Sequence, residues 1–414
     1  MRRLVVTCAA GLVGLGIVSC QAATDAWTKL TSDAPVSAAQ TPTVATAPAK
    51  PETPTKLEPT TPEPTAVVKQ IEPPKPPDPA KAPEPARPWA TPAAESAAFE
   101  LAAARVTADL LRKNVEALAA DDMNGRPTPS PELERAAQVI ASEFGRLALE
   151  VPSRAPEYRQ RFECGAPGAG ESSNVVGLFP GFDVALAEQF IIVSAHYDHL
   201  GISDTPDTGD DTIFNGANDD ASGVAAMIAI AEVLHALPNR PRRSVLFVGF
   251  CGEERGLRGS SHYAEDPVVP HGSTVAHLNL EMLGRPGETT PTRAWMTGSK
   301  LSTLGEALVT VGAEAGIEFV DGEVVGATEG NLFERSDNYP LARAGVVAHS
   351  ISTGRLDEFY HHVDDEIALL EYERMVPIVR ALARVVWRLA QDDAKPQWTA
   401  AGTAAGFAPP GRWD

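Results

Sequence analysis

Five short apolar segments, each of strand length and without an interrupting charge, constrain the fold of this chain more than any other feature. They are residues 174–179, 190–195, 244–250, 276–280 and 345–350. Strands that are apolar on both faces are typical of parallel sheets covered by helices on both sides. Helical spacing of apolar residues over 97–120, 131–147 and 221–237 supplies such helices. The pattern predicts an α/β fold: a three-layer sandwich whose central mixed sheet is mostly parallel and covered by helices on both faces.

Proline divides the chain into regions. Many of the 36 prolines among 414 residues fall between residues 33 and 91, where aromatic and large aliphatic residues are almost absent. Such a segment buries too little apolar surface to offset its ordering entropy, so we expect residues 20–96 to be a disordered linker. One compact domain is then expected over residues 97–394. The Gly-, Ala- and Pro-containing residues 395–414 are expected to form a flexible tail.

The first residues are typical of an export signal. An arginine pair precedes an apolar run over 4–18, which is too short to span a bilayer. The sequence Ile-Val-Ser-Cys that ends at Cys20 resembles the lipobox of bacterial lipoproteins, so residues 1–19 are expected to be the signal peptide and Cys20 the lipid-carrying residue. The glutamine after Cys20 resembles the default signal for outer-membrane sorting, which places the protein at the periplasmic or cell-surface side of that membrane. The alternative is ordinary cleavage near Ala22 and a soluble periplasmic protein.

Charge and cysteine content bear on partners and oxidation. The formal net charge of −20 disfavours nucleic acid and anionic membrane surfaces, because both repel an acidic chain. Cys164 and Cys251 remain after the signal peptide. An exported protein could oxidise them to a disulfide. We expect instead that Cys251, at the end of an apolar strand, is a buried free thiol.

Polar residues with metal-binding chemistry follow the predicted strands. His196 comes directly after segment 190–195, and Asp198 could orient its imidazole for metal binding, although such a pair is also common on surfaces. Asp219 and Asp220 precede helix 221–237, where they could bridge cations or cap the helix. In open α/β sheets, ligands bind beyond the carboxyl ends of the strands. These residues are therefore expected at one edge of the sheet.

Further candidates follow later strands. Glu253 and Glu254 come directly after segment 244–250, where one could bind metal while the other takes a proton from water; a solvated turn is the alternative. Glu281 follows segment 276–280, and His361 lies late in the chain. The candidates are too far apart to share one helical turn, which excludes a His-Glu-x-x-His site. The site must be assembled from separate loops.

The ordered series of these motifs resembles the co-catalytic dizinc exopeptidases, a family that includes bacterial leucyl aminopeptidases, glutamate carboxypeptidases and glutaminyl cyclases. The resemblance covers about residues 106–389, including Asn-Gly-Arg at 124–126 and Ser-Asp-Asn at 336–338. It implies two Zn²⁺ ions bridged by one aspartate, with one glutamate as general base and one aspartate orienting a histidine. The implied metal ligands are His196, Asp219, Glu254, Glu281 and His361, the implied base is Glu253, and the orienting residue is Asp198.

The resemblance divides these ligands between the two ions. One zinc would bind His196 and Glu281, and the other would bind Glu254 and His361. His361 is preferred to His362 because it directly follows Tyr360. The family usually has aspartate at the position of Glu281, so the second zinc site depends on a variant ligand.

The resemblance also implies an activity. The first expectation is a zinc-dependent aminopeptidase that removes N-terminal residues from peptides in the cell envelope. A carboxypeptidase or a glutaminyl cyclase on the same site is the alternative; carboxypeptidase relatives need basic residues such as Arg335 or Arg355 in the pocket, and cyclases depart from the Asp-Asp-Ala-Ser-Gly sequence found at 219–223. A third possibility, from a different functional class, is a tethered binding protein without catalytic activity. Relatives of that kind lose metal ligands.

Overall fold

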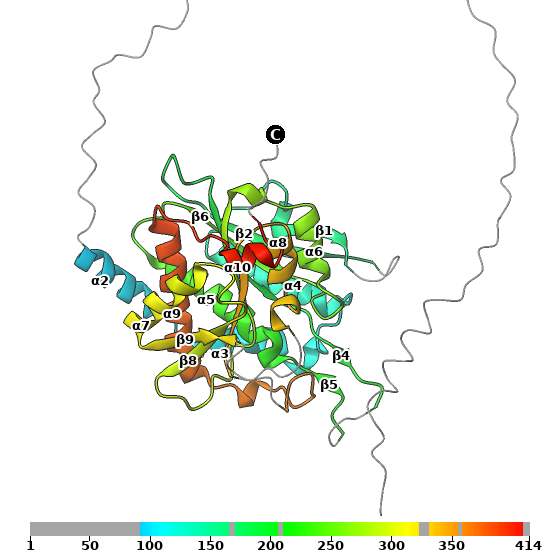
Figure 1. The fold of residues 1–414 in the computed structure, drawn as a ribbon. Coiled ribbons are helices and arrows are strands. Elements are labelled where there is room, and N and C mark those ends of the chain that lie inside the picture. Colours follow the sequence, from blue (N-terminus) through cyan, green and yellow to red (C-terminus); the bar gives the residue numbers. More distant parts are fainter. Residues whose placement is uncertain (1–91, 165–169, 206–209, 323–330, 355–357, 409–414) are drawn as a thin grey trace, which may run out of the picture. The chain divides into compact units, whose positions relative to one another are not determined.

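A computed structural model of the chain describes residues 92–164, 170–205, 210–322, 331–354 and 358–408, with side chains from residue 97 onward (Figure 1). The predicted signal peptide, Cys20 and nearly all of the predicted linker lie outside these residues. The described residues belong to one compact unit. None of the described helices combines the length and apolar character that crossing a bilayer requires.

An eight-stranded mixed sheet forms the centre of this unit. In spatial order its strands are β1 (Arg159–Glu163), β2 (Glu171–Phe179), β6 (Ser244–Phe250), β3 (Phe190–His196), β7 (Thr274–Leu280), β10 (Ala348–Ser352), β8 (Thr292–Met296) and β9 (Ile317–Asp321). The four central strands β6, β3, β7 and β10 are parallel, as are β8 and β9, whereas β1–β2, β2–β6 and β10–β8 are antiparallel pairs. A separate ribbon pairs β4 (Gly201–Ile202) with β5 (Ile213–Phe214).

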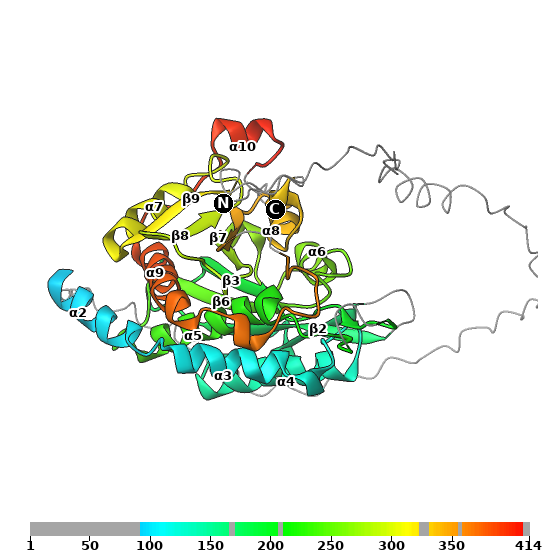
Figure 2. The ribbon, with the colours of Figure 1, turned by 90° about the horizontal axis from the view of Figure 1, so that it is seen from below.

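Helices cover both faces of the sheet (Figure 2). One face carries α3 (Ala108–Ala119), α4 (Pro131–Arg146), α5 (Ser222–Ala236), α7 (Leu304–Ala315) and α9 (Tyr372–Gln391). The other carries α6 (Arg258–Glu265) and α8 (Asn338–Arg343). Successive residues of one strand serve opposite cores: Ile191 and Val193 pack toward the first face, and Ile192 packs toward the second. The predicted three-layer sandwich with a mostly parallel mixed sheet is confirmed.

Helix α5 is buried on all sides because it lies between the sheet and an outer layer formed by α3 and α9. Its sequence is apolar around its whole circumference, and many of its residues are alanine, so neighbouring elements approach it closely. This position fixes the start of α5 against the carboxyl ends of the strands, where the candidate residues lie.

The first predicted helix is in fact two. Helix α2 (Pro92–Ala103) ends before Thr107, which caps α3 by accepting a hydrogen bond from the backbone N–H of Leu110 at 3.1 Å. The apolar spacing continues through the break, because Val106 between the two helices is also fully buried. Periodicity alone therefore did not reveal the interruption.

Cys164 and Cys251 form a disulfide, so the expectation of a buried free thiol at Cys251 is wrong. Cys164 directly follows β1 and Cys251 directly follows β6, and both strands pair with β2. The sequence separation of 87 between the two cysteines hid this proximity.

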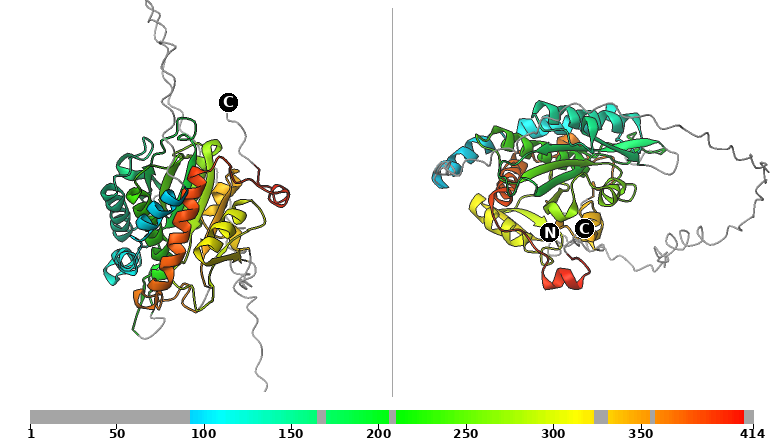
Figure 3. Two further views of the ribbon diagram at one scale, coloured as in Figure 1. Left: turned by 90° about the vertical axis from the view of Figure 1, so that its left-hand side faces the viewer. Right: turned by 90° about the horizontal axis from the view of Figure 1, so that it is seen from above.

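Of the predicted flexible tail (residues 395–414), the structure describes residues 395–408, which include one short helix. Helix α10 (Ala400–Ala404) lies on the side of the domain opposite to α3 and α4 (Figure 3). Trp398 donates from Nε1 to the carbonyl of Gly345 at 3.0 Å and stacks on Phe407, which is buried. Trp398 and Phe407 thus attach residues 395–408 to the core on the α6 and α8 face of the sheet. The small-residue composition of this segment did not predict this attachment.

Candidate metal centre

The candidate ligands gather at one edge of the sheet. The parallel strands β6, β3 and β7 end there. His196 is the last residue of β3, Glu254 lies in the loop after β6, and Glu281 directly follows β7. The short helix η3 (Ala217–Ala221) brings Asp219 to the same place from the start of α5. His361 enters from the loop before α9. The position agrees with the general rule that ligands bind beyond strand carboxyl ends.

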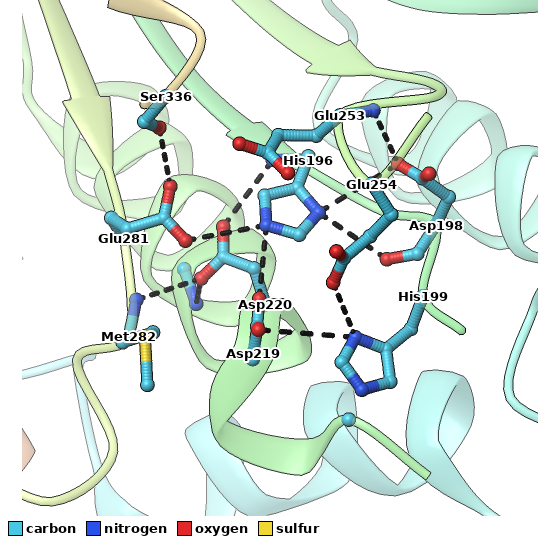
Figure 4. A network of polar contacts seen from close by, with 12 residues as sticks. His196, Asp198, His199, Asp219, Asp220, Glu253, Glu254, Glu281, Met282 and Ser336 are labelled. Atoms are coloured by element: carbon cyan, nitrogen blue, oxygen red, sulfur yellow. Dashed lines mark hydrogen bonds and ion pairs between the residues drawn. The ribbon is translucent and has the colours of Figure 1, made fainter. Parts of the chain in front are cut away.

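Asp219 faces a different group of side chains with each carboxylate oxygen (Figure 4). Its Oδ1 lies 3.1 Å from His196 Nε2, and Glu281 Oε1 lies 3.2 Å from the same nitrogen. Its Oδ2 lies 3.3 Å from His361 Nε2, which is 3.1 Å from Glu254 Oε2. The five residues predicted as ligands therefore form two clusters that share Asp219, a geometry in which one carboxylate can bridge two cations.

Asp220 follows Asp219 through a cis peptide bond and fixes the surrounding backbone. Its Oδ1 accepts hydrogen bonds from the backbone N–H groups of Gly223 at 3.1 Å and Met282 at 3.0 Å, and its Oδ2 accepts one from that of His196 at 3.3 Å. Asp220 also lies close to His196 and Glu281, but both of its oxygens accept these backbone hydrogen bonds. Asp219 is therefore the better-placed bridging residue.

Asp365 holds the loop of Asp219 from the other side. Its carboxylate accepts hydrogen bonds from the backbone N–H groups of Asn218, at 3.0 and 3.1 Å, and of Asp219, at 3.0 Å. Arg285 donates to Asp365 Oδ1 at 3.0 Å. Burial raises the pKa of Asp365, although Arg285 opposes this effect. The backbone of the bridging residue is thus fixed before any cation binds.

A buried arginine, Arg126, lies beneath the site. Its guanidinium donates to the backbone carbonyls of Tyr197 (3.0 Å), Leu118 (2.7 Å), Asn215 (2.7 Å) and Gly216 (3.1 Å). Burial lowers its pKa to about 10, so it stays charged at neutral pH. One cation therefore ties the end of α3 to the segments on either side of the site.

Glu253, the predicted base, lines the pocket beside the clusters. Its backbone N–H donates to Asp198 Oδ1 at 3.1 Å, and Thr128 Oγ1 donates to Asp198 Oδ2 at 3.0 Å. Asp198 Oδ1 also lies 3.7 Å from His196 Nδ1. Asp198 is thus placed to orient both the imidazole and the loop of Glu253. Burial raises the pKa of the Glu253 carboxyl well above its ordinary value, and neighbouring carboxylates add to this effect.

The clusters attract cations strongly. Although burial opposes charge, Glu281 and Asp219 raise the pKa of His196 well above its ordinary value. Likewise Asp219 and Glu254 raise the pKa of His361 to about 10 against the effect of burial. Burial would raise the pKa of Glu254, yet the two histidines beside it lower it to about 2. In the absence of metal, protons occupy the positions where cations are favoured, so metal and protons compete for this site.

Glu281 is held by a chain of buried hydrogen bonds. Ser336 Oγ donates to Glu281 Oε2 at 2.5 Å and accepts from Asn279 Nδ2 at 2.8 Å. Asn279 Oδ1 accepts from Ser194 Oγ at 2.7 Å, and Ser194 Oγ lies 2.6 Å from His277 Nε2. The longer side chain of glutamate therefore still presents its other oxygen, Oε1, to the first cluster.

His199 belongs to the site although its sequence position gave it no separate role. It is fully buried, and its Nδ1 lies 2.8 Å from Glu254 Oε1 and 4.0 Å from Asp219 Oδ2. His362, by contrast, faces Asp364, with Nδ1 3.2 Å from its Oδ2. The only sequence signal for His199 was a second histidine three residues after His196.

The donor set fits divalent metal ions. Imidazole nitrogens and carboxylate oxygens are ligands that suit zinc. Within the described part of the chain, Glu254 Oε1 and both ring nitrogens of His199 are buried without a hydrogen-bond partner. Buried polar atoms without partners are costly, and a cation between them would satisfy them. Two groups of three residues come close enough to hold an ion each: His196, Asp220 and Glu281, and His199, Asp219 and Glu254.

A pocket opens beside Asp219, Glu253 and Glu281. Its remaining wall combines apolar, hydroxyl and one cationic side chain: Met282, Trp295, Thr297, Leu332, Arg335, Ser336, Ser350, Ser352, Thr353 and Tyr360. Arg335 Nη2 donates to Tyr360 Oη at 3.4 Å. The pocket thus adjoins Asp219, the carboxylate that the two clusters share.

The segment that carries these residues matches a known family. The sequence profile described as "Peptidase family M28" matches residues 174–386, just over half of the chain. The chain belongs to peptidase family M28. All seven predicted catalytic and metal-ligating residues of this M28 site lie within the matched range.

Curated relatives are similar to parts of this chain. Aminopeptidase YwaD of Bacillus subtilis (strain 168) is 26% identical over 236 residues, which cover 55% of this chain and 46% of YwaD. A probable zinc metalloprotease of Leptosphaeria maculans is 31% identical over 140 residues, 34% of this chain and 30% of that protein. The matched part therefore spans less than half the length of either relative.

Solved structures share the M28 fold. LapA aminopeptidase of Legionella pneumophila superposes with a TM-score of 0.55 at 18% identity, covering 72% of this chain and 75% of LapA. BSAP, a zinc aminopeptidase from Bacillus subtilis, gives 0.54 at 15% identity, covering 70% and 97%. A glutaminyl cyclase of Bacteroides thetaiotaomicron gives 0.52 at 16% identity, covering 68% and 98%. One fold thus carries different activities, and the site must distinguish between them.

Proposed function

We propose that this protein is a zinc-dependent aminopeptidase that removes N-terminal residues from peptides. The observation that carries the proposal is the position of Asp219, whose two oxygens face separate histidine–carboxylate clusters next to Glu253. Membership of peptidase family M28 supports a hydrolytic reaction. The names of YwaD and BSAP, an aminopeptidase and a zinc aminopeptidase, support this choice of metal and bond.

The side chains divide the chemistry between them. His196, Asp219, Glu254, Glu281 and His361 would hold the zinc ions, which would supply Lewis acidity and lower the pKa of the attacking water. Glu253 takes the proton from that water and passes it to the departing amine. Burial and neighbouring carboxylates raise the pKa of Glu253, which favours its uptake of a proton. Asp198 keeps His196 and the Glu253 loop in place throughout.

A specific observation favours a carboxypeptidase as the second candidate. Arg335, which carboxypeptidase chemistry would need near the substrate carboxylate, lines the pocket and lies close to Tyr360. Arg355, the other basic residue considered for this role, lies outside the described residues. Because Arg335 lines the pocket, an assay must decide whether the enzyme cleaves peptides from the N-terminus or from the C-terminus.

Peptides blocked at one end test this choice. The zinc-loaded protein is incubated with one peptide in three forms: free at both ends, N-acetylated, and C-amidated. An aminopeptidase cleaves the free and C-amidated forms and ignores the N-acetylated one. A carboxypeptidase cleaves the free and N-acetylated forms and ignores the C-amidated one. Removal of metal with a chelator should abolish cleavage, and added zinc should restore it. If the metal-loaded protein binds these peptides without cleaving any of them, the silent binding protein becomes the better description.

We also propose that the enzyme is exported and anchored to the outer membrane through a lipid on Cys20. The support is the arginine pair, apolar run and lipobox-like sequence that ends at Cys20. Cys20→Ala should move the protein from the membrane fraction to the soluble periplasmic fraction and abolish labelling by a fatty acid. Membrane attachment that persists in Cys20→Ala would contradict the lipid anchor.

A further inference from the structure

His199 is held rigidly beside the candidate metal centre. Its backbone N–H donates to the carbonyl of Arg126 at 3.2 Å, and a backbone bridge joins it to Pro127. Its ring packs on Gly216 so closely that a Cβ at Gly216 would lie 2.5 Å from ring carbons. Because the backbone is fixed and one face of the ring is covered, the imidazole has little freedom to turn away from Glu254.

The ring nitrogens of His199 have no hydrogen-bond partner within the described part of the chain. Nδ1 lies 2.8 Å from Glu254 Oε1, but the two groups are not aligned for a hydrogen bond. Glu254 Oε1 has no other hydrogen-bond partner among the described residues. Asp219 Oδ2, the oxygen that faces His361, lies 4.0 Å from the same nitrogen. Three donor atoms from His199, Glu254 and Asp219 therefore converge without satisfying one another (Figure 4).

A purely orienting histidine would look different. A histidine that only positions a metal-binding carboxylate donates an aligned N–H to it. Asp198, a positioning residue of this site, makes such aligned contacts with a backbone N–H and a hydroxyl. His199 Nδ1 makes no aligned contact to Glu254.

We propose that His199 Nδ1 is a third imidazole ligand of the metal centre, on the ion that Glu254 and His361 bind. The inference rests on the proposed function, since it requires that the centre holds two zinc ions. It makes the two ions unequal. One has imidazoles from His199 and His361 together with Glu254 and Asp219 Oδ2, whereas the other has one imidazole, from His196, together with Glu281 and Asp219 Oδ1.

This inequality predicts an order of metal binding. The ion with two imidazole ligands should bind first and leave last, and the ion beside the variant ligand Glu281 should exchange more readily. Under limited chelation the protein should therefore retain one zinc, and the retained zinc should have two nitrogen ligands.

X-ray absorption at the zinc edge tests the ligand directly, because it counts imidazoles per zinc and does not depend on activity. The two-zinc wild-type protein should show three imidazoles for two ions. His199→Asn should show two, and the dissociation constant of one of its ions should rise by more than the 10- to 100-fold that follows loss of an orienting residue. His235→Asn is the matched control, because His235 is exposed at the end of α5. It should keep the wild-type count and affinities.

The outcomes separate this inference from the proposed function. Two imidazoles for two zinc ions in the wild-type protein, or unchanged affinities in His199→Asn, would overturn the role of His199 and leave the dizinc enzyme intact. A wild-type protein that binds no zinc would overturn both. If His199→Asn does not fold, the imidazole count of the wild-type protein alone decides the matter.

Discussion

Two of the candidate metal ligands, Glu281 and His196, depend on a neighbour that fixes the direction of the side chain. Ser336 holds the second oxygen of Glu281, and Asp198 lies against the Nδ1 side of His196. Such neighbours leave one donor atom of each ligand directed at the cluster, which reduces the reorganisation that metal binding requires. The extra methylene of Glu281 is therefore compatible with a metal site because Ser336 determines where its carboxylate lies.

Glu281→Ala should lose one metal equivalent and most of the activity. The side chain supplies one of the three donors around the first cluster, and His196 and Asp219 alone do not complete that site. Elemental analysis of the dialysed protein measures the metal content. Glu288→Ala, a change at an exposed glutamate, should retain both ions. Full zinc content in Glu281→Ala would contradict its assignment as a ligand.

Glu253→Gln should separate metal binding from proton transfer. Glutamine keeps the size of the side chain and the backbone N–H that donates to Asp198, but it cannot take a proton from water. We expect kcat to fall by about 10²- to 10⁴-fold with both zinc ions retained. Steady-state kinetics together with metal analysis check this result. A variant that retains kcat within tenfold of the wild type would show that another group acts as the base.

The sequence predicted most residues of the site but not His199. His196, Asp219, Glu254 and Glu281 follow apolar runs, so their place at the strand ends could be deduced from the pattern. The position of His199 depends instead on packing against Gly216 and on a backbone bond to Arg126, both distant in sequence. Spacing cannot reveal such contacts.

At the scale of elements, buried segments were easier to predict than edge segments. The central strands β3 and β6 are apolar on both faces, and their predicted bounds agree with the structure to within one residue. The edge strand β9 and its neighbour β8 carry half-exposed or polar residues, so no continuous apolar run marked them. The same reason explains the other edge strand, β1, in which Phe162 is the one apolar residue.

The disulfide between Cys164 and Cys251 links β1 to the loop that carries Glu253 and Glu254. Replacing both cysteines by serine should lower the free energy of unfolding by about 2–5 kcal/mol, since the bond closes a long loop and restricts the unfolded chain. Because the loop after β6 then loses one attachment, we also expect weaker metal binding. Denaturant unfolding of the oxidised wild type and the double variant measures the first effect.

The outcome has a clear alternative. If the double variant and the wild type unfold at the same denaturant concentration, the disulfide contributes nothing to stability. A wild-type protein treated with reductant under denaturing conditions and refolded should behave like the variant, which controls for the serine substitutions themselves.

The whole molecule buries histidines within its sandwich as well as at its metal centre. His349 in β10 is fully buried, with Nδ1 2.8 Å from the carbonyl of Thr297 and Nε2 2.7 Å from Ser302 Oγ. Burial lowers its pKa to about 4, although the bond to Thr297 opposes this. At the metal centre, by contrast, carboxylates raise the pKa of His361 to about 10 against burial. The fold thus lowers the pKa of His349 and raises the pKa of His361.

The contribution of His349 to stability should therefore depend on pH in a defined window. Its pKa is depressed in the folded state, so between pH 6.5 and about 4 the unfolded chain binds the proton more readily and the stabilisation is lost as pH falls. The difference in unfolding free energy between the wild type and His349→Asn should be constant above pH 7 and should shrink by about 1.4 kcal/mol per pH unit below 6.5.

Taking this difference removes the titration of the other groups, including Asp337, whose pKa is raised to about 7 and whose effect on stability has the opposite sign. Urea unfolding with chelator present, from pH 4 to 8, measures the difference without competition between metal and protons at His196 and His361. If the His349→Asn difference is the same at every pH, His349 is not held neutral by its burial, and the packing of β10 between the two helical layers is looser than the structure shows.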